Sequence, residues 1–369
     1  MSSLQLPFSP NLDRIPTYSP GRPIDEVARE LGLPPGDIIK LASNENPLGP
    51  SPAALAAMER SLKTLHLYPD GNAFHLKRRL AAKLGLQPEN LILGNGSNEI
   101  IEFAGHALLG PGAEVVVSQY CFAVYPIVTR LFGANLVTVP ARNHGHDLPA
   151  MLRAITPRTR IVFAANPNNP TGTLAPASEV MALVNGVPPE TLLVMDEAYT
   201  EFLDAQDRCD LLPLIRSGAK PNLILMRTFS KLYGLAGLRL GYGIGHPDLV
   251  AALEKIRQPF NINALVQAGA LAALDDEEHV QRTLQNNRAG LAFYEKACQD
   301  LGLPIIRSAA NFLLIRVGDG ARVVQDLQKL GIIVRSVAGY DLPDYIRISV
   351  GTPAENARTM AGLRQVLGK

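Results

Sequence analysis

Seven short runs of apolar residues, separated by helical patterns, dominate the chain between roughly residues 90 and 245. Each run is continuous rather than alternating with polar residues, so the strand it forms must be covered on both faces. Helical patterns between the runs, such as Glu99–Leu109 and Ala177–Asn185, supply that cover. The pattern predicts an α/β fold with a mainly parallel central sheet sandwiched by helices. The expected strands are Leu91–Leu93, Glu114–Val117, Leu136–Val139, Arg160–Ala164, Leu192–Met195, Leu223–Met226 and Leu240–Ile244.

The two ends of the chain differ from this central part. Residues 1–50 are rich in proline and predict an extended arm with one short helix near Ile24–Leu31. A long helical pattern, Ala264–Leu301, leads into strand-like pieces at 311–317, 331–337 and 345–351. We therefore expect an N-terminal arm (1–45) packing with a small domain, a large domain (46–270) and a small α+β domain (271–369).

Composition excludes several classes of partner. The 35 basic and 34 acidic residues give a net charge of +1, and no basic block indicates a nucleic-acid or membrane surface. Three widely spaced cysteines form neither a CxxC pair nor a disulfide framework, which favours a reducing compartment. The sequence shows no signal-peptide pattern and no apolar run long enough to span a bilayer. We expect a cytoplasmic protein without nucleic-acid or membrane partners.

One lysine lies among hydroxyls and glycines, just after an expected strand. Lys231 belongs to the segment RTFSKLYGLAGLR, which also contains Thr228, Ser230 and Arg239. A desolvated lysine loses its proton easily, and its neutral amine can attack a carbonyl. The neighbouring donors suit a phosphate, and pyridoxal 5′-phosphate (PLP) carries both an aldehyde and a phosphate. The alternative is a strand, a small-residue turn and a surface lysine, and this segment alone does not separate the two.

Unusual polar sequence follows three more of the expected strands. The segments are GNGSNE at 94–99, NPNNPTG at 166–172 and DEAY at 196–199. Reactive groups of an open parallel sheet collect beyond the carboxyl ends of its strands, so we expect these segments to meet. Asp196 would pair with a pyridine nitrogen, while Asn169 and Tyr199 would donate to the ring's phenolic oxygen. A helix cap for Asp196 and a tight turn for 166–172 are the alternatives.

Further residues complete this hypothesis. The backbone of Ser97 and Asn98 opens a helix and would cradle a phosphate, although a capped glycine turn is the commoner reading. Phe122 and Tyr125, just past an expected strand, could each stack an aromatic on the pyridine ring, unless they are simply core residues. Of the two, Phe122 is the expected stacking residue. Arg335 and Arg347 suit carboxylate or phosphate recognition, with an edge or ion-pair role as the alternative. No P-loop, dinucleotide fingerprint or metal-type His/Cys cluster is present, so we expect no metal.

The motifs NPNNPTG, DEAY, RTFSKLYGLAGLRLGY and RISVG, in this order, resemble fold-type I PLP-dependent aminotransferases of the aspartate aminotransferase superfamily. KLASNENPLGPSP, YPDGN and GNGSNEII are similar, more narrowly, to the histidinol-phosphate aminotransferases. The resemblance covers essentially the whole chain from about Tyr18 onward. One departure is Phe122, where many relatives have a tyrosine.

The resemblance implies a role for each site residue. Lys231 would form a Schiff base with PLP and transfer the substrate proton, with Asp196 and Tyr199 as further catalytic residues. Tyr68 would reach the phosphate from the other subunit, so a homodimer would share its active sites and the arm would also contact the partner. Substrate would contact Tyr18, Asn44, Arg335 and Arg347. The phosphate would contact Ser97, Asn98, Thr228, Ser230 and Arg239.

The implied reaction is transamination between histidinol phosphate and 2-oxoglutarate, giving imidazole acetol phosphate and glutamate in histidine biosynthesis. Near relatives leave transamination of aromatic amino acids, or decarboxylation of a phosphorylated amino acid, open. A non-catalytic PLP-fold regulator is a third possibility, but residues 1–50 carry no basic helix-turn-helix pattern to support it.

Overall fold

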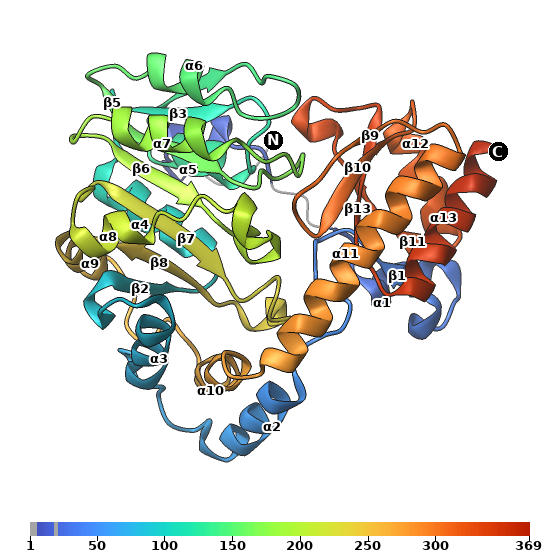
Figure 1. Ribbon diagram of the computed structural model, residues 1–369, viewed down its shortest axis with the longest axis horizontal. Helices are drawn as coiled ribbons and strands as arrows, with labels where there is room; N and C mark the ends of the chain where they lie inside the picture. Colours follow the sequence, from blue (N-terminus) through green and yellow to red (C-terminus); the bar gives the residue numbers. More distant parts are fainter. Residues whose placement is uncertain (1–5, 18–20) are drawn as a thin grey trace.

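A computed structural model describes residues 6–17 and 21–369 of the chain. Its largest element is a seven-stranded sheet in the order β2-β8-β7-β6-β5-β3-β4 (Figure 1). Strand β8 pairs antiparallel with β7 and β2, and the other pairings are parallel. The mainly parallel sheet is thus confirmed, and each expected strand is found with its ends shifted by at most two residues. The strands are β2 (Leu91–Gly94), β3 (Glu114–Ser118), β4 (Asn135–Val139), β5 (Thr159–Ala165), β6 (Leu192–Asp196), β7 (Leu223–Thr228) and β8 (Gly241–Gly245).

Side chains of these strands alternate between two buried layers, which explains why the runs read as continuously apolar. In β6, Leu193 and Met195 face one layer while Leu192 and Val194 face the other. Helices α3, α6, α7, α8 and α10 cover the first layer, and α4, α5 and α9 cover the second (Figure 1). The helices are α2 (Pro52–Ser61), α3 (Phe74–Leu84), α4 (Ser97–Leu108), α5 (Val124–Leu131), α6 (Leu148–Arg153), α7 (Ala177–Gly186), α8 (Leu212–Ser217), α9 (Pro247–Glu254) and α10 (Ala264–Ala273).

The C-terminal part forms a second, smaller core. A four-stranded antiparallel sheet in the order β12-β13-β10-β9 packs against helices α11, α12 and α13 (Figure 1). None of the helices in the described part of the chain is long and apolar enough to cross a membrane. The elements are α11 (Glu277–Asp300), β9 (Ile305–Ile306), β10 (Phe312–Arg316), α12 (Gly320–Lys329), β11 (Ile332–Ile333), β12 (Arg335–Ser336), β13 (Tyr345–Ser349) and α13 (Pro353–Leu367).

The long helical pattern at 264–301 is two helices rather than one. Helix α10 ends at Ala273, and α11 begins after Asp276, whose side chain accepts a hydrogen bond from the backbone N–H of His279. An aspartate in this position caps a new helix, so the two aspartates at 275–276 mark the break.

The N-terminal segment contacts both cores. Its short helix α1 (Ile24–Leu31) forms where expected and buries Val27 and Ala28 against Ile333. Strand β1 (Ile39–Lys40) pairs parallel with β11 of the smaller core. The 3₁₀ helix η1 (Pro10–Arg14) instead packs on α5 of the larger core.

Candidate active site

A cavity of about 350 Å³ lies at the carboxyl ends of β5, β6 and β7, between the two cores. Its volume lies in the usual range for small-molecule sites. It brings together most of the residues singled out from the sequence, although they are scattered over some 300 positions. The predicted residues lining it are Asn44, Ser97, Asn98, Phe122, Asn169, Asp196, Tyr199, Thr228, Ser230, Lys231, Arg239, Arg335 and Arg347.

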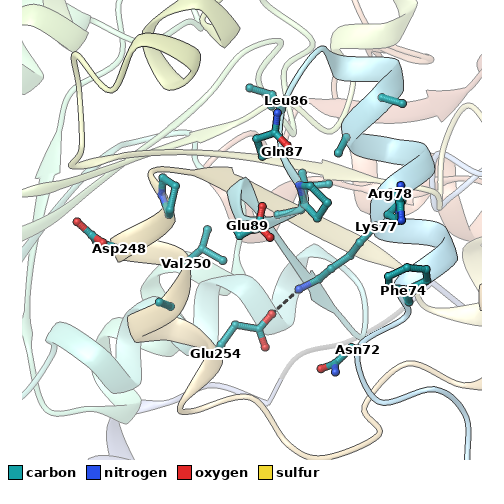
Figure 2. Close-up of a pocket in the computed structure, with 16 residues that line it drawn as sticks. Asn72, Phe74, Lys77, Arg78, Leu86, Gln87, Glu89, Asp248, Val250 and Glu254 are labelled. Atoms are coloured by element: carbon teal, nitrogen blue, oxygen red, sulfur yellow. Dashed lines mark hydrogen bonds and ion pairs between the residues drawn. The ribbon is translucent and has the colours of Figure 1, made fainter.

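Among the described residues, one predicted site residue does not line this cavity. Tyr68 is 83% exposed and stacks on Phe260 with ring centroids 4.7 Å apart. Tyr18 lies outside the described residues. A larger cavity of about 960 Å³, between α3 and α9, contains none of the predicted site residues (Figure 2). Cavity size alone would therefore have pointed away from the predicted residues.

Lys231 projects from the loop that follows β7. Its Nζ donates a 3.0 Å hydrogen bond to the carbonyl of Ser43. Burial lowers the pKa of the Lys231 amine to about 8, and the positive charges of Arg347 and Arg239 act in the same direction. A substantial fraction of the amine is therefore neutral near physiological pH, as a nucleophile requires.

The tight loop after Lys231 depends on one glycine. Gly234 has a φ of +68°, and a Cβ atom there would lie 2.2 Å from the carbonyl oxygen of Gly49. A larger residue would push the loop of Lys231 away from the segment that precedes α2. This steric limit explains why the motif has a glycine at position 234.

Asp196 ends β6 with its carboxylate held from two sides. Its Oδ2 accepts a 2.6 Å hydrogen bond from the hydroxyl of Tyr125, and its Oδ1 accepts one of 3.0 Å from the N–H of Ala198. Burial raises the pKa of Asp196. Such a carboxyl is most stable as an anion when a positive group stands beside it, which a protonated ring nitrogen provides.

The sequence offered Tyr125 as an aromatic that could stack on the cofactor ring, whereas the structure shows its hydroxyl bound to Asp196. It is fully buried and stacks on Phe163, with ring centroids 4.5 Å apart. Phe122 lines the cavity and meets Tyr125 edge-on at 5.7 Å. The pattern Phe-Ala-Val-Tyr after β3 offered both aromatics, but nothing in it showed which one contacts Asp196.

Hydrogen bonds tie the N-terminal segment to both cores. Asn44 Nδ2 donates to the Tyr199 hydroxyl at 2.8 Å, and the N–H of Asn44 donates to Ser349 Oγ at 2.8 Å. Burial raises the pKa of Tyr199 to about 12, so its hydroxyl remains protonated. The hydroxyl can therefore donate into the cavity while it accepts from Asn44.

The two arginines of the smaller core lie side by side. Arg335 and Arg347 are directly opposite each other in the β12–β13 pairing. Arg347 donates to Asn169 Oδ1 at 2.6 Å and to the carbonyl of Ala42 at 3.0 Å. One arginine thus bridges both cores and the N-terminal segment at the edge of the cavity.

The start of α4 forms a cradle with Arg239. The helix is capped by Gly96, which has a φ of +76°, and a Cβ atom there would lie 2.3 Å from Arg239 Nη2. A Cβ atom at Gly241 would lie 2.2 Å from the backbone nitrogen of Ser97. Both glycines therefore leave room for a guanidinium and a helix N-terminus to meet, which is the geometry of a phosphate site.

Two hydroxyls complete the cradle. Arg239 Nη1 donates to Ser230 Oγ at 3.4 Å, and Ser230 lines the cavity. Thr228 also lines it, but its hydroxyl already donates to the carbonyl of Leu240 and accepts from the N–H of Ser230. The cradle, the low-pKa lysine and the buried carboxylate together fit the phosphate, aldehyde and ring nitrogen of PLP.

Comparison with known proteins agrees with this geometry. The sequence profile of the class I and II aminotransferases matches residues 36–363. The chain belongs to that family. The aminotransferase is 50% identical to histidinol-phosphate aminotransferase 1 of Thiobacillus denitrificans, over 97% of this chain and 93% of the relative. It is 51% identical to the histidinol-phosphate aminotransferase of Akkermansia muciniphila, over 95% of this chain and 96% of the relative.

Solved structures agree with the fold. The crystal structure of histidinol-phosphate aminotransferase from Sinorhizobium meliloti, in complex with pyridoxal-5′-phosphate, has a TM-score of 0.90 and 32% identity, and covers 99% of both chains. Aspartate aminotransferase from Thermus thermophilus with maleate has a TM-score of 0.82 at 22% identity, over 98% of this chain and all of the other. The resemblance to fold-type I aminotransferases, and narrowly to the histidinol-phosphate enzymes, is confirmed.

Proposed function

We propose that this aminotransferase transfers an amino group between histidinol phosphate and 2-oxoglutarate, giving imidazole acetol phosphate and glutamate in histidine biosynthesis. PLP is the cofactor. The observation that carries the proposal is the single cavity in which Lys231, Asp196 and Arg239 meet, in a chain about half identical to enzymes of that name.

Bound PLP supplies an electron sink that stabilises negative charge on the substrate carbon. The residues of the chain hold the cofactor and move the proton. Asp196, oriented by Tyr125, holds the ring nitrogen, and Asn169 and Tyr199 hold the phenolic oxygen. Lys231 Nζ, with its pKa near 8, accepts a proton at one position of the substrate and delivers it at another.

The phosphate of PLP is assigned to one end of the cavity. The N–H groups of Ser97 and Asn98, the hydroxyl of Ser230 and the guanidinium of Arg239 are the donors there, with Thr228 supporting Ser230. Charge-assisted hydrogen bonds at a helix N-terminus are the strongest contacts available to a phosphate in this fold.

The acidic group of the substrate is assigned to Arg347 and Arg335, with Asn44 beside them and Tyr18 as an additional contact. Two guanidinium groups on neighbouring strands suit both the phosphate of histidinol phosphate and a carboxylate of glutamate. One pair of arginines would then serve both half-reactions.

We further propose a homodimer in which Tyr68 reaches the phosphate site of the partner subunit. Apolar side chains exposed at and around α2 and the loop before α3 support it, because a concentration of this kind marks an association surface. These side chains are Leu55, Leu62, Leu65, Leu67, Tyr68, Phe74 and Phe260. Sedimentation should give twice the monomer mass, and a monomer that retains full activity would refute this arrangement.

We also propose domain boundaries for the chain and a cellular compartment for the enzyme. We assign residues 1–45 to the arm, 46–270 to the large domain and 271–369 to the small domain, in keeping with the separate cores. We place the enzyme in the cytoplasm, where Cys121, Cys209 and Cys298 stay reduced; all three are free thiols in the structure.

Substrate profiling tests the function directly. The purified protein should show the visible absorption band of bound PLP, and borohydride should trap the cofactor covalently. Lys231→Ala should abolish both, whereas Lys255→Ala, which changes an exposed lysine of the α9 C-terminus, should abolish neither. With 2-oxoglutarate as the amino acceptor, kcat/KM for histidinol phosphate should greatly exceed that for phenylalanine; the opposite preference would favour an aromatic aminotransferase.

A further inference from the structure

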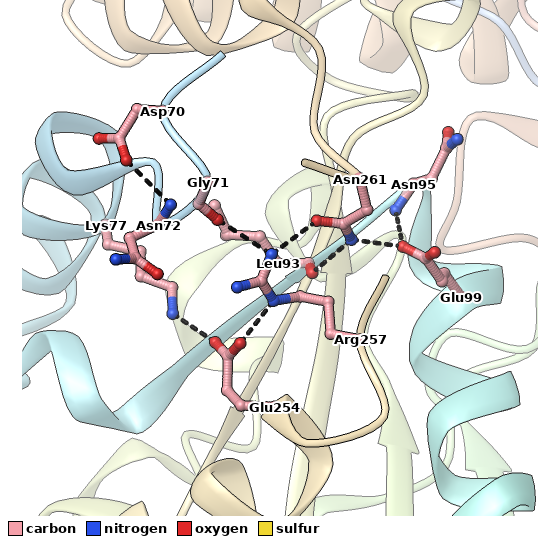
Figure 3. Close-up of polar contacts among 10 residues, drawn as sticks. All are labelled: Asp70, Gly71, Asn72, Lys77, Leu93, Asn95, Glu99, Glu254, Arg257 and Asn261. Carbon is pink, nitrogen blue, oxygen red and sulfur yellow. Dashed lines mark hydrogen bonds and ion pairs between the residues drawn. The ribbon is translucent and has the colours of Figure 1, made fainter. Parts of the chain in front are cut away.

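A chain of polar contacts joins the loop that carries Tyr68 to the first turn of α4 (Figure 3). Its central members are Arg257 and Asn261, which lie between α9 and α10 and do not line the cavity. They therefore do not contact PLP directly. Each of them, however, contacts a segment that would bind PLP in the proposed dimer: the loop of Tyr68 or the first turn of α4.

Asn261 contacts the α4 side. Its Nδ2 donates to Glu99 Oε2 at 2.6 Å and to the carbonyl of Leu93, at the end of β2, at 3.2 Å. The same Glu99 oxygen accepts the N–H of Asn95 at 2.6 Å (Figure 3). Asn261 thereby orients the Glu99 carboxylate, and this carboxylate in turn holds the Asn95–Gly96 turn. The turn directly precedes Ser97 and Asn98, whose N–H groups face the phosphate in the proposed site.

Arg257 contacts the loop side. Its Nη1 donates to the carbonyl of Gly71 at 3.0 Å and to Asn261 Oδ1 at 2.9 Å. Its Nε donates to Glu254, which also accepts a 2.6 Å bond from Lys77 of α3 (Figures 2 and 3). The Arg257 side chain is only 14% exposed, so these contacts hold its guanidinium in one orientation.

The loop at 68–72 is shaped around these contacts. Asp70 accepts the N–H groups of Asn72 and Phe74 at 2.9 and 2.8 Å and so caps the start of α3. Tyr68 stacks on Phe260, the neighbour of Asn261. Gly71 lies between the two anchor points, because its carbonyl is held by Arg257 and a Cβ atom there would lie 3.4 Å from the Phe260 ring.

We propose that Asn261 and Arg257 are positioning residues for the phosphate of PLP. Asn261 acts through Glu99 on the N-terminal turn of α4, and Arg257 acts through Gly71 on the loop that presents Tyr68 to the partner subunit. The role of Arg257 rests on the proposed dimeric site, whereas the role of Asn261 depends only on contacts within one chain.

The number of hydrogen bonds that Asn261 makes explains why its substitution should weaken binding of the PLP phosphate. Its amide donates twice and its carbonyl accepts once, so three segments share one side chain. Alanine at this position leaves Glu99 Oε2 with the Asn95 N–H alone and frees the carboxylate to rotate. The N–H groups of Ser97 and Asn98 would then be aimed less well at the phosphate.

The test compares PLP with pyridoxal, which lacks the phosphate, in titrations of the apoenzyme. Asn261→Ala should weaken PLP binding about tenfold, as expected for a loosened contact to a charged group, and leave pyridoxal binding nearly unchanged. Asn222→Ala is the matched control: it removes an asparagine amide that also donates twice, to the carbonyls of Pro188 and Thr191 near the start of β6, and should change neither affinity. If Asn261→Ala does not fold, Asn261→Ser is measured instead.

An unchanged PLP affinity, or an equal loss for PLP and pyridoxal, would overturn the Asn261 assignment. For Arg257, the variant Arg257→Lys keeps the charge beside Glu254 but loses the planar fork. It should weaken PLP binding about fivefold in the parent protein and by a clearly smaller factor when Tyr68→Phe is already present, the remainder acting through Asn261. Additive effects would overturn the Arg257 assignment.

A Tyr68→Phe variant with unchanged PLP affinity would overturn the shared dimeric site and the role of Arg257 together. The Asn261 result would still stand by itself, so the two failures are distinguishable.

Discussion

The hydroxyl of Tyr125 donates a 2.6 Å hydrogen bond to Oδ2 of Asp196 at the end of β6. Burial, together with the charge of Asp196, raises the pKa of Tyr125 well above its usual value, so this phenol is always a donor. The carboxylate is therefore fixed before the cofactor binds. Pre-orientation of this kind reduces the reorganisation required when charge develops on the ring.

Tyr125→Phe is expected to lower the free energy of unfolding by about 1–3 kcal/mol, because a buried carboxylate loses a donor. It should also lower kcat, since Asp196 becomes free to rotate. Chemical denaturation and steady-state kinetics measure the two effects. Tyr120→Phe, at a partly buried tyrosine outside this contact, should leave both unchanged; an intact kcat in Tyr125→Phe would contradict the orienting role.

The rate at which the apoenzyme captures PLP should depend on pH through Lys231. Only the neutral amine reacts, and its folded pKa is near 8 rather than the usual value for lysine. The rate should therefore rise about tenfold per pH unit below the pKa and level off above it. Stopped-flow absorbance measures the profile. A rise that continues to about pH 10 would show that burial does not lower this pKa.

The buried carboxyl of Glu201 should make the free energy of unfolding depend on pH, independently of catalysis. Burial raises its pKa to about 7, with the Glu197 charge acting in the same direction, and its Oε2 has no hydrogen-bond partner within the described residues. The folded protein retains a proton that the unfolded chain releases at lower pH, so stability falls as pH rises towards 7 and is then constant.

Glu201→Gln should remove the loss of stability that accompanies the rise in pH. Relative to the parent, the variant should gain stability between about pH 4.5 and pH 7, reaching at most about 3 kcal/mol above that range. Denaturant unfolding at several pH values gives the difference. A difference that does not change with pH would rule out the buried carboxyl as its source.

Arg347→Ala should affect both substrate and cofactor. Loss of a desolvated charge-assisted contact typically costs about 2–5 kcal/mol, so KM should rise strongly. Because Arg347 also holds Asn169 Oδ1 at 2.6 Å, the absorption band of bound PLP should shift as well. Arg316→Ala, at an exposed arginine of the same sheet, is the control. An unchanged KM would remove Arg347 from the substrate site.

Gly241→Ala should weaken PLP binding, because its Cβ would lie 2.2 Å from the nitrogen of Ser97 and displace the α4 N-terminus. Gly110→Ala has no atom within 4 Å of the added Cβ and serves as the control. Apoenzyme titration should show a loss of at least about tenfold for Gly241→Ala alone. Equal affinities in the two variants would mean that the cradle adapts to the methyl group.

The sheet and much of the cavity could be predicted because their signals are local. Continuous apolar runs specify doubly covered strands, and the polar segments after β5, β6 and β7 meet because parallel strands end at one edge. Lys231 and Asp196 follow directly from that rule. The cap at Asp276 was also a local signal, but the helical pattern on both sides of it concealed the break.

The remaining contacts depend on how separate segments pack. Tyr125 reaches Asp196 across 71 positions, Asn44 reaches Tyr199 across 155, and Arg347 reaches Asn169 across 178. No periodicity or spacing encodes such pairs. The first is set by how α5 packs on the large sheet, and the other two by the relative placement of the two cores and the N-terminal segment. The same holds for Arg257 and Asn261, whose sequence neighbours carry no catalytic motif.

The hydrogen bond between Asn44 and Ser349 has a consequence for biogenesis. The two residues are 305 positions apart, a distance that a ribosome covers in about 15–60 s at ~5–20 residues per second. Throughout that interval the early segment emerges without the strand that anchors it. Cofactor capture is therefore expected to follow translation of β13, and a nascent chain arrested before that strand should remain colourless.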